Sequence, residues 1–165
     1  QGIGRRGCSD PGLGATHGGN PKRVWLIIAK GKTMADCVKV RPASGAEGKQ
    51  GLTYFEGIAK ETAGSQGICM HLLTIPPGGR AKAHKHESHE TTIFVLKGKA
   101  IMYWGEALEH RMETNEGELI YIPADVPHLP INNSSEPVSA VIARTDPHEQ
   151  ESVVLLPELE ALVTE

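Results

Sequence analysis

The sequence has few aromatic residues, no strong charge and no long apolar run. Phe, Trp and Tyr make up only 4% of its 165 residues, so it lacks the stacked rings on which many nucleic-acid-binding surfaces hold bases. The net charge of -3 gives no basic excess to attract phosphates or an anionic membrane. The longest apolar run near the N-terminus, 24–29, is far shorter than the roughly 20 residues needed to cross a bilayer. We interpret it as a strand, and expect neither nucleic acid nor membrane as a partner.

Cysteines are also few. Cys8, Cys37 and Cys69 are odd in number and far apart, which does not describe a disulfide framework. Such usage is typical of a reducing compartment, so we expect a cytoplasmic protein. Cys69 lies in an apolar run and is predicted to be a small core residue.

The N-terminal segment is rich in Gly and small polar residues. It cannot bury enough apolar area to order itself alone. Residues 2–7 match a GxGxxG pattern, but no strand precedes them and no helical pattern follows, so we reject a dinucleotide site. Met34 is an alternative start, which would make 1–33 an extension. We predict an irregular N-terminal extension at 1–45 and a single β-barrel domain at 46–165.

From position 50 onward, short apolar runs alternate with Gly, Pro and Asn turns. This spacing is typical of an all-β sandwich or barrel. The good helix formers at 157–163 predict one or two helical turns at the C-terminus, close to the shortest length that is stable. The predicted strands are 52–58, 67–75, 91–96, 100–104, 118–122 and 138–144.

Five of the eight histidines fall between positions 84 and 128. On a strand, the spacing of His84 and His86 places both imidazoles on one face, roughly 6–7 Å apart. His128 follows Pro127 in a segment stiffened by proline, so its imidazole has little entropy left to lose. Three such side chains suit one divalent transition metal ion, with Mn, Fe, Ni, Zn and Co as candidates.

Residues 78–98 and 117–132 resemble the two motifs of the cupin superfamily, and the likeness extends over about 65–145. It implies an all-β jelly-roll barrel with a metal inside, and commonly a dimer. Among cupins, the chain resembles small single-domain bacterial proteins of the sugar-phosphate isomerase type. The matching residues are Gly78, His84, His86, Glu90 and Gly98 in the first motif, and Gly117, Pro123, Asp125, His128 and Asn132 in the second.

The chain departs from these motifs at two positions. Asp125 replaces a glycine, which is a minor change because Asp tolerates turn conformations. Glu90, the motif's carboxylate ligand, is one residue too far from Gly98, so that the count falls on Thr91 instead. Neighbouring strand residues face opposite ways. Either a bulge turns Glu90 inward as the fourth ligand beside the three histidines, or water completes the metal shell; His89 is a competing donor.

Several residues are candidates to line the cavity. Arg80 and Lys82 share the parity of His84, and we predict that they bind an anionic group of the substrate together with Arg144. Solvated surface positions are the alternative for these cations. We expect Thr91, Ile93 and Val95 on one face of their strand, with Met102 and Trp104 closing the pocket. His71 is predicted in the core or at its rim, and His17, His110 and His148 are predicted at the surface, in loops or turns.

The residues leave three functions open, and the resemblance favours the first. The first is a metal-dependent isomerase or epimerase of a small polar metabolite such as a sugar phosphate, with Glu90 or His89 as the catalytic proton shuttle. The second is a non-haem metal dioxygenase. The third is a non-catalytic module that binds or senses a small ligand. In each case the expected partners are a small molecule and a second copy of the chain.

Overall fold

The computed structural model describes residues 36–41, 45–148, 150 and 152–164. Residues 37–165 form one compact unit. The predicted strand at 24–29, the glycine-rich segment 2–7, Cys8, His17 and Met34 lie outside the described residues. The predicted domain boundary between residues 45 and 46 stays a prediction. In the described part of the chain, no helix is long and apolar enough to span a membrane.

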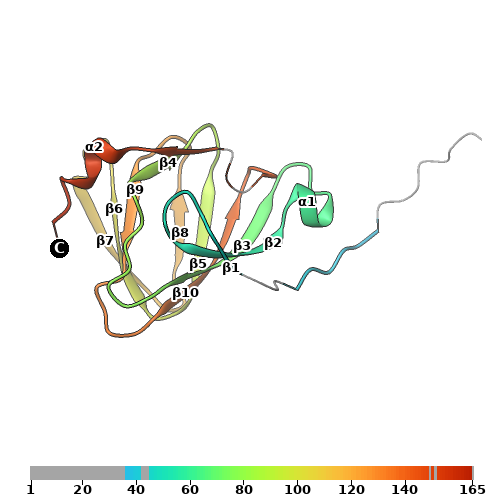
Figure 1. Ribbon diagram of the computed structural model, residues 1–165, viewed down its shortest axis with the longest axis horizontal. Helices are drawn as coiled ribbons and strands as arrows, with labels where there is room; N and C mark the ends of the chain where they lie inside the picture. The colour runs from blue at the N-terminus through green and yellow to red at the C-terminus, as the bar shows by residue number, and fades with distance from the viewer. Residues whose placement is uncertain (1–35, 42–44, 149, 151, 165) are drawn as a thin grey trace, which may run out of the picture. The chain divides into compact units, whose positions relative to one another are not determined.

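Two antiparallel sheets build the jelly-roll barrel, which confirms the predicted all-β fold (Figure 1). Two helices of one turn each accompany them in the described segments: α1 (Lys60–Ala63) and α2 (Pro157–Glu160). The six-stranded sheet has the order β1 (Gly45–Glu47), β2 (Thr53–Ile58), β3 (Cys69–Ile75), β10 (Val138–Arg144), β5 (Thr91–Lys97) and β8 (Leu119–Ile122); the five-stranded sheet has the order β11 (Val153–Leu155), β4 (His84–His86), β9 (His128–Ile131), β6 (Lys99–Trp104) and β7 (His110–Asn115).

Strict alternation of side chains aims one face of the larger sheet into the barrel. In β10, Val138, Ala140, Ile142 and Arg144 are buried, while the residues between them are partly exposed. β10 lies between β3 and β5, so its inward residues meet the inward residues of both neighbours. Buried side chains from both sheets form the main core cluster, which includes Leu73 of β3, Val95 of β5 and Met102 of β6. Burial of this apolar area is the main term that holds the two sheets together.

All six predicted strands exist, with ends that differ by at most two residues. The C-terminal helix is also present as α2. β7 was not predicted, because its sequence, HRMETN, is largely polar and exposed at the edge of its sheet. Predicted as a loop residue, His110 is the first residue of this strand and is exposed. Three other short elements were not predicted either: β1, α1 and β11. Each has three or four residues, which is too short to show a periodic pattern of apolar side chains.

Four motif positions have a left-handed backbone: Gly78, Gly98, Gly117 and Asp125. Gly98, between β5 and β6, has φ +85°, and a Cβ there would lie 2.8 Å from the carbonyl oxygen of Pro137. Asp125 has φ +64°, a conformation that Asp tolerates better than most residues. Its carboxylate accepts a hydrogen bond from the Ser88 N–H at 3.3 Å and contacts the Lys85 ammonium at 3.4 Å. The replacement of glycine by aspartate therefore ties the loop before β9 to the end of β4.

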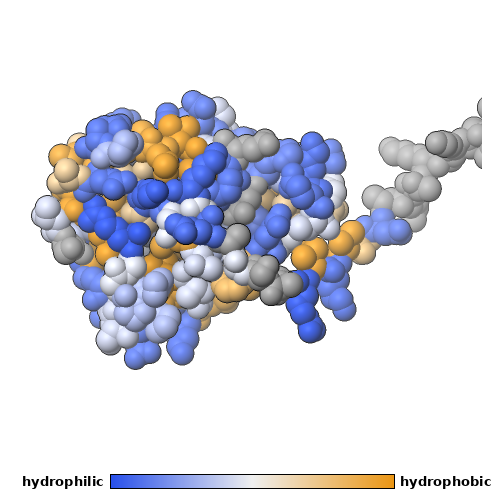
Figure 2. All heavy atoms as spheres, viewed as in Figure 1, coloured by the Kyte–Doolittle hydropathy of each residue, from blue (hydrophilic) through white to orange (hydrophobic). Residues whose placement is uncertain are grey.

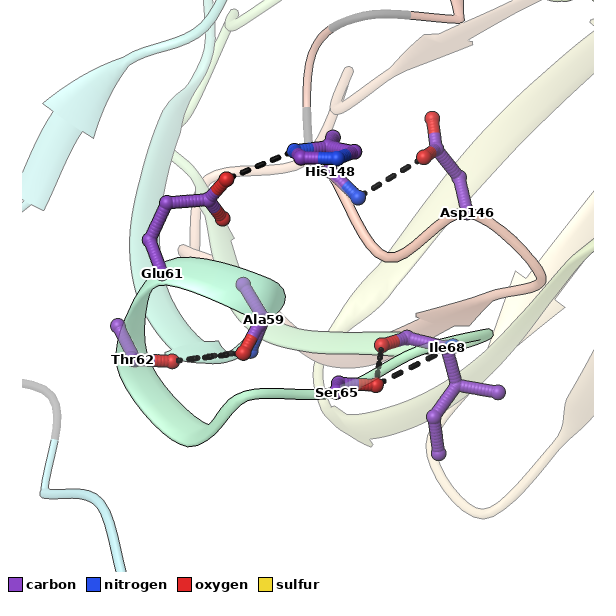
Figure 3. Close-up of polar contacts among 7 residues, drawn as sticks. All are labelled: Ala59, Glu61, Thr62, Ser65, Ile68, Asp146 and His148. Atoms are coloured by element: carbon purple, nitrogen blue, oxygen red, sulfur yellow. Dashed lines mark hydrogen bonds and ion pairs between the residues drawn. The ribbon is translucent and has the colours of Figure 1, made fainter.

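Side-chain contacts fix the segments at the two ends of the barrel. The Glu61 carboxylate of α1 lies 2.7 Å from Nδ1 of His148, and the His148 N–H donates to Asp146 (Figure 3). The loop that follows β10 is thus held against α1. A second apolar cluster, which includes Leu129, Ile131 and Val163, lies under the C-terminal segment. Apolar residues are visible beside α2 and β4 in Figure 2.

Candidate metal centre

Two strands of the smaller sheet bring the three predicted histidines together. His84 and His86 stand on β4, and His128 begins β9, directly opposite His84 in the register. Each is 3% exposed, and the candidate ligand nitrogens all lie within 4.8 Å of one another. The ring centroids of His84 and His128 are 4.2 Å apart, and that of His86 is 5.1 and 5.4 Å from them. The positions that sequence spacing predicted therefore converge on one point.

Backbone carbonyls orient two of the three rings. Nδ1–H of His84 donates to the carbonyl of Lys82 at 2.8 Å, and Nδ1–H of His128 donates to the carbonyl of Val126 at 2.9 Å. A carbonyl only accepts, so these bonds fix Nδ1 as the protonated nitrogen and leave Nε2 as the ligand atom. Nδ1 of His86 is buried without a hydrogen-bond partner among the described residues. An oriented set of imidazoles, one with an unpaired buried nitrogen, fits a divalent transition metal ion.

Burial keeps these imidazoles in the form that metals bind. It is the main cause that lowers the pKa of His84 well below its usual value, and the pKa of His128 to about 4. Burial also lowers the pKa of His86 strongly. The positive charge of Arg144 acts in the same direction on all three. At neutral pH the rings are therefore uncharged, and no proton has to leave before a metal binds.

The histidines line one part of an internal cavity of about 50 Å³. As expected, Thr91, Ile93 and Val95 line it, and so does Met102. Trp104 does not: it is partly buried, packs against the main core cluster and stacks on His110 with ring centroids 4.3 Å apart. Space of this size holds a few water molecules or one small ligand. A metal held by the histidines would therefore have coordination positions that face this small cavity.

Glu90 and His89 lie apart from the histidine cluster. β5 begins at Thr91, which is buried and faces inward, whereas Glu90 is exposed. The Glu90 carboxylate accepts a hydrogen bond of 2.6 Å from the Tyr121 hydroxyl, and Nδ1 of His89 bonds the carbonyl of Thr145 at 2.9 Å. No bulge turns Glu90 inward, because the register shift between β5 and β10 falls at Leu96, which the pairing skips, at the far end of β5 from Glu90. This corrects the expected inward direction of Glu90.

Replacing Glu90 with glutamine is expected to leave Zn²⁺ affinity within about twofold of wild type. The carboxylate is exposed and bonded to Tyr121, so its charge is screened by water and contributes little to the metal site. Calorimetric titration of metal-free protein measures this directly. A loss of about tenfold or more would mean that Glu90 swings inward when the metal binds.

The three predicted anion-binding residues occupy different places. The Arg80 guanidinium donates to the carbonyls of Val163 and Glu160, both at 2.7 Å, and so fixes the C-terminal segment. Lys82 is exposed. Neither lines the cavity, which corrects the expected shared direction with His84: β4 begins only at His84, so strand alternation does not extend back to residue 80. Arg144 is 4% exposed and does line the cavity.

Sequence reasoning missed part of this environment. The carbonyls that orient His84 and His128 belong to the backbone and have no sequence signature. Tyr54 and Thr114 also line the cavity, and alternation along their strands was the available signal. His71 is 2% exposed, which confirms the core placement; likewise, Cys69 is fully buried. His148 is only partly exposed, since it contacts Glu61.

Known proteins match the same part of the chain. Residues 71–144 match the family model described as "Cupin domain". An uncharacterized protein of Methanocaldococcus jannaschii is 27% identical over 82 residues, which are 50% of this chain and 63% of that protein. The chain thus spans less than two thirds of this relative's length.

Solved structures share the fold. The oxalate decarboxylase of Lactobacillus farciminis, solved as a formate complex, superposes with a TM-score of 0.59 at 20% identity, over 73% of this chain and 36% of that one. A Cupin 2 conserved barrel domain protein of Salinispora arenicola gives a TM-score of 0.57 at 16% identity, over 67% of this chain and 91% of the other. With the two sheets described above, the family match shows that residues 71–144 have the cupin fold.

Proposed function

We propose that this protein is a metal-dependent enzyme that acts on a small molecule inside the barrel. The observation that carries the proposal is the convergence of three buried imidazoles on the wall of an internal cavity. When bound, a divalent metal in such a site supplies Lewis acidity or, as iron, reactions with O₂. The protein's part is to hold neutral imidazoles in place and to limit access of water to the cavity. The scattered cysteines support a cytoplasmic location.

The cavity lining bears on the reaction. An isomerase needs a group that moves a proton at the substrate carbon. The two residues predicted for this role, Glu90 and His89, are not among the lining residues, and the described lining holds no carboxylate. This favours a reaction that the metal itself carries out, such as oxygenation, over a proton-shuttling isomerisation. Isomerisation remains the second candidate because Tyr54 lines the cavity and carries a hydroxyl group.

One experiment separates these reactions. Protein loaded in turn with Mn²⁺, Fe²⁺, Ni²⁺, Zn²⁺ and Co²⁺ is given short-chain carboxylates and sugar phosphates. Oxygen uptake that requires Fe²⁺ and substrate would support the oxygenase. Anaerobic incorporation of solvent deuterium into the substrate would support the isomerase. No turnover of any substrate with any of the five metals would contradict an enzyme and leave a ligand-binding or sensing module.

The outer face of the six-stranded sheet supports a homodimer. Six of its outward residues are large and apolar, although they face solvent: Met70, Leu72, Phe94, Leu96, Leu119 and Tyr121. An exposed apolar patch of this kind is typical of an interaction surface. Leu119 protrudes, with 79% of its surface exposed, and a surface hollow lies between Phe55, Leu72 and Leu96 on the same sheet. In a two-fold symmetric dimer, Leu119 of each copy would enter the hollow of the other copy.

Replacing Leu119 with glutamate is expected to convert a dimer into a monomer. The change would bury a charge in the interface, and interface residues of this kind contribute about 2 kcal/mol or more, which raises the dissociation constant roughly 30-fold. Sedimentation equilibrium measures the mass against the 17.7 kDa of one chain. The matched control is Leu162→Glu, which alters an exposed leucine beyond α2. Equal mass for wild type and L119E would contradict the interface.

A further inference from the structure

The larger sheet gives the cavity a wall of hydrocarbon. The register of β3, β10, β5 and β8 aligns the inward residues of neighbouring strands in rows across the sheet. Two adjacent rows contribute only aliphatic side chains to the cavity lining: Leu73, Ala140 and Val95 in the first row, and Ile142, Ile93 and Ile120 in the second. Met102 of the smaller sheet lines the cavity as well. Aliphatic side chains from both sheets therefore line the same space as the three histidines.

The two aliphatic rows offer a ligand no hydrogen bond. Their six side chains have no donor or acceptor, and the backbones of β3, β10 and β5 are paired with other strands on both sides. A sugar carries a hydroxyl group on most of its carbon atoms, and each hydroxyl that loses water without gaining a partner lowers affinity about tenfold. A hydrocarbon body, by contrast, gains affinity when it leaves water for such a wall.

Polar side chains of the lining lie outside the two rows. Arg144 and Thr91 pair in the next row along the strands, and the Thr91 hydroxyl accepts the Nε–H of Arg144 at 3.1 Å. Thr114 belongs to β7 of the smaller sheet, and its hydroxyl donates to the carbonyl of Ala100 at 3.2 Å. The hydrocarbon surface is therefore continuous over the two rows, whatever groups a ligand meets elsewhere in the cavity.

We propose that the substrate has a hydrocarbon body, which lies against the two aliphatic rows while its polar head meets the metal site. This inference rests on the proposed function, since the head is placed at the three histidines. It names a different substrate class from the sugar phosphate that the sequence suggested. The cavity volume of about 50 Å³ limits the body to a few carbon atoms.

Three hydroxamic acids with the same metal-binding head test this proposal on the zinc-loaded full chain. Acetohydroxamic acid has a methyl body, and butyrohydroxamic acid extends it by two carbon atoms. In 3-hydroxypropanohydroxamic acid, a hydroxyl group replaces the last methyl group of the butyryl chain, so the size stays nearly the same. Because the head is identical, any contribution of the metal or of Arg144 to its binding cancels in the comparison. Methyl NMR shifts of the lining Ile and Val residues measure the affinities without any turnover.

Butyrohydroxamic acid is expected to bind roughly tenfold more tightly than acetohydroxamic acid, because each buried carbon atom adds about three- to fourfold. It is expected to bind at least about tenfold more tightly than the hydroxyl analogue. Equal affinity for the hydroxyl analogue, or no gain over acetohydroxamic acid, would overturn the proposal. Zinc content is measured in the same samples. Zinc-loaded protein without the preference contradicts the substrate class alone, whereas protein that binds no zinc contradicts the metal enzyme and the substrate class with it.

A variant pair assigns the preference to the aliphatic rows. Val95→Thr adds a hydroxyl group to the first row with little change of shape, and is expected to reduce the preference for butyrohydroxamic acid over the hydroxyl analogue at least about threefold. Val163→Thr makes the same change in the second apolar cluster, outside the cavity lining, and is expected to leave the preference unchanged. A folded V95T with the wild-type preference would overturn the placement of the body against this row. The comparison on wild-type protein does not depend on the folding of either variant.

Discussion

Replacement of His128 with alanine is expected to lower Zn²⁺ affinity at least about 100-fold. The three imidazoles are the whole set of candidate ligands in the described cluster, so loss of one leaves two donors. Loss of a group that merely orients a ligand already costs about 10–100-fold in affinity, and loss of a ligand costs more. His128 is the informative choice because it comes from β9, whereas His84 and His86 share β4. Competition with a chromophoric chelator measures the affinity.

The control for this variant is His110→Ala. His110 is exposed at the start of β7 and does not belong to the cluster, so its replacement is expected to leave Zn²⁺ affinity unchanged. Circular dichroism checks that both variants keep the barrel. Equal affinities for wild type and a folded H128A would exclude the three-histidine site, and with it the proposed metal enzyme.

The sequence predicted the part of this site that depends on local spacing. One intervening residue places His84 and His86 on one face of a strand, and the second motif supplies His128; the structure brings the three together. The sequence could not decide whether the Glu90 side chain points into the barrel, because the side of the strand on which a residue lies depends on where the strand begins. Tyr121, 31 residues away, bonds Glu90 on the outside of the barrel, and a partner so distant in sequence leaves no local signal.

The same reason explains the errors at Arg80 and Lys82. Their parity with His84 has meaning only inside a continuous strand, and β4 covers only His84–His86. Arg144, by contrast, ends a seven-residue strand whose alternation is unbroken, and that alternation carries it into the cavity. Even spacing from a known site residue therefore predicts that a side chain points into the cavity only where one long strand joins the two residues. It fails where the strand is short.

Acid is expected to destabilise the barrel through His71. This residue of β3 is 2% exposed, and its Nδ1 accepts the Gly57 N–H at 3.3 Å. Burial, with a smaller contribution from the charge of Arg144, lowers its pKa to about 4. Well above pH 6.5 the histidine is neutral in both the folded and the unfolded chain, so it does not lower the free energy of unfolding. As the pH falls toward 4, His71 binds a proton in the unfolded chain but stays neutral in the folded chain. The free energy of unfolding then declines.

The expected loss from this one group is about 2 kcal/mol between pH 7.5 and pH 5, because each pKa unit corresponds to about 1.4 kcal/mol. His71→Asn keeps an acceptor near the Gly57 N–H and has no proton to gain in this range. Urea unfolding of both proteins at the two pH values, without metal, measures the difference. The other buried histidines titrate in both proteins, so their contribution cancels in the comparison. An H71N variant that loses as much stability in acid as wild type would show that the lowered pKa of His71 is not the cause of the acid destabilisation.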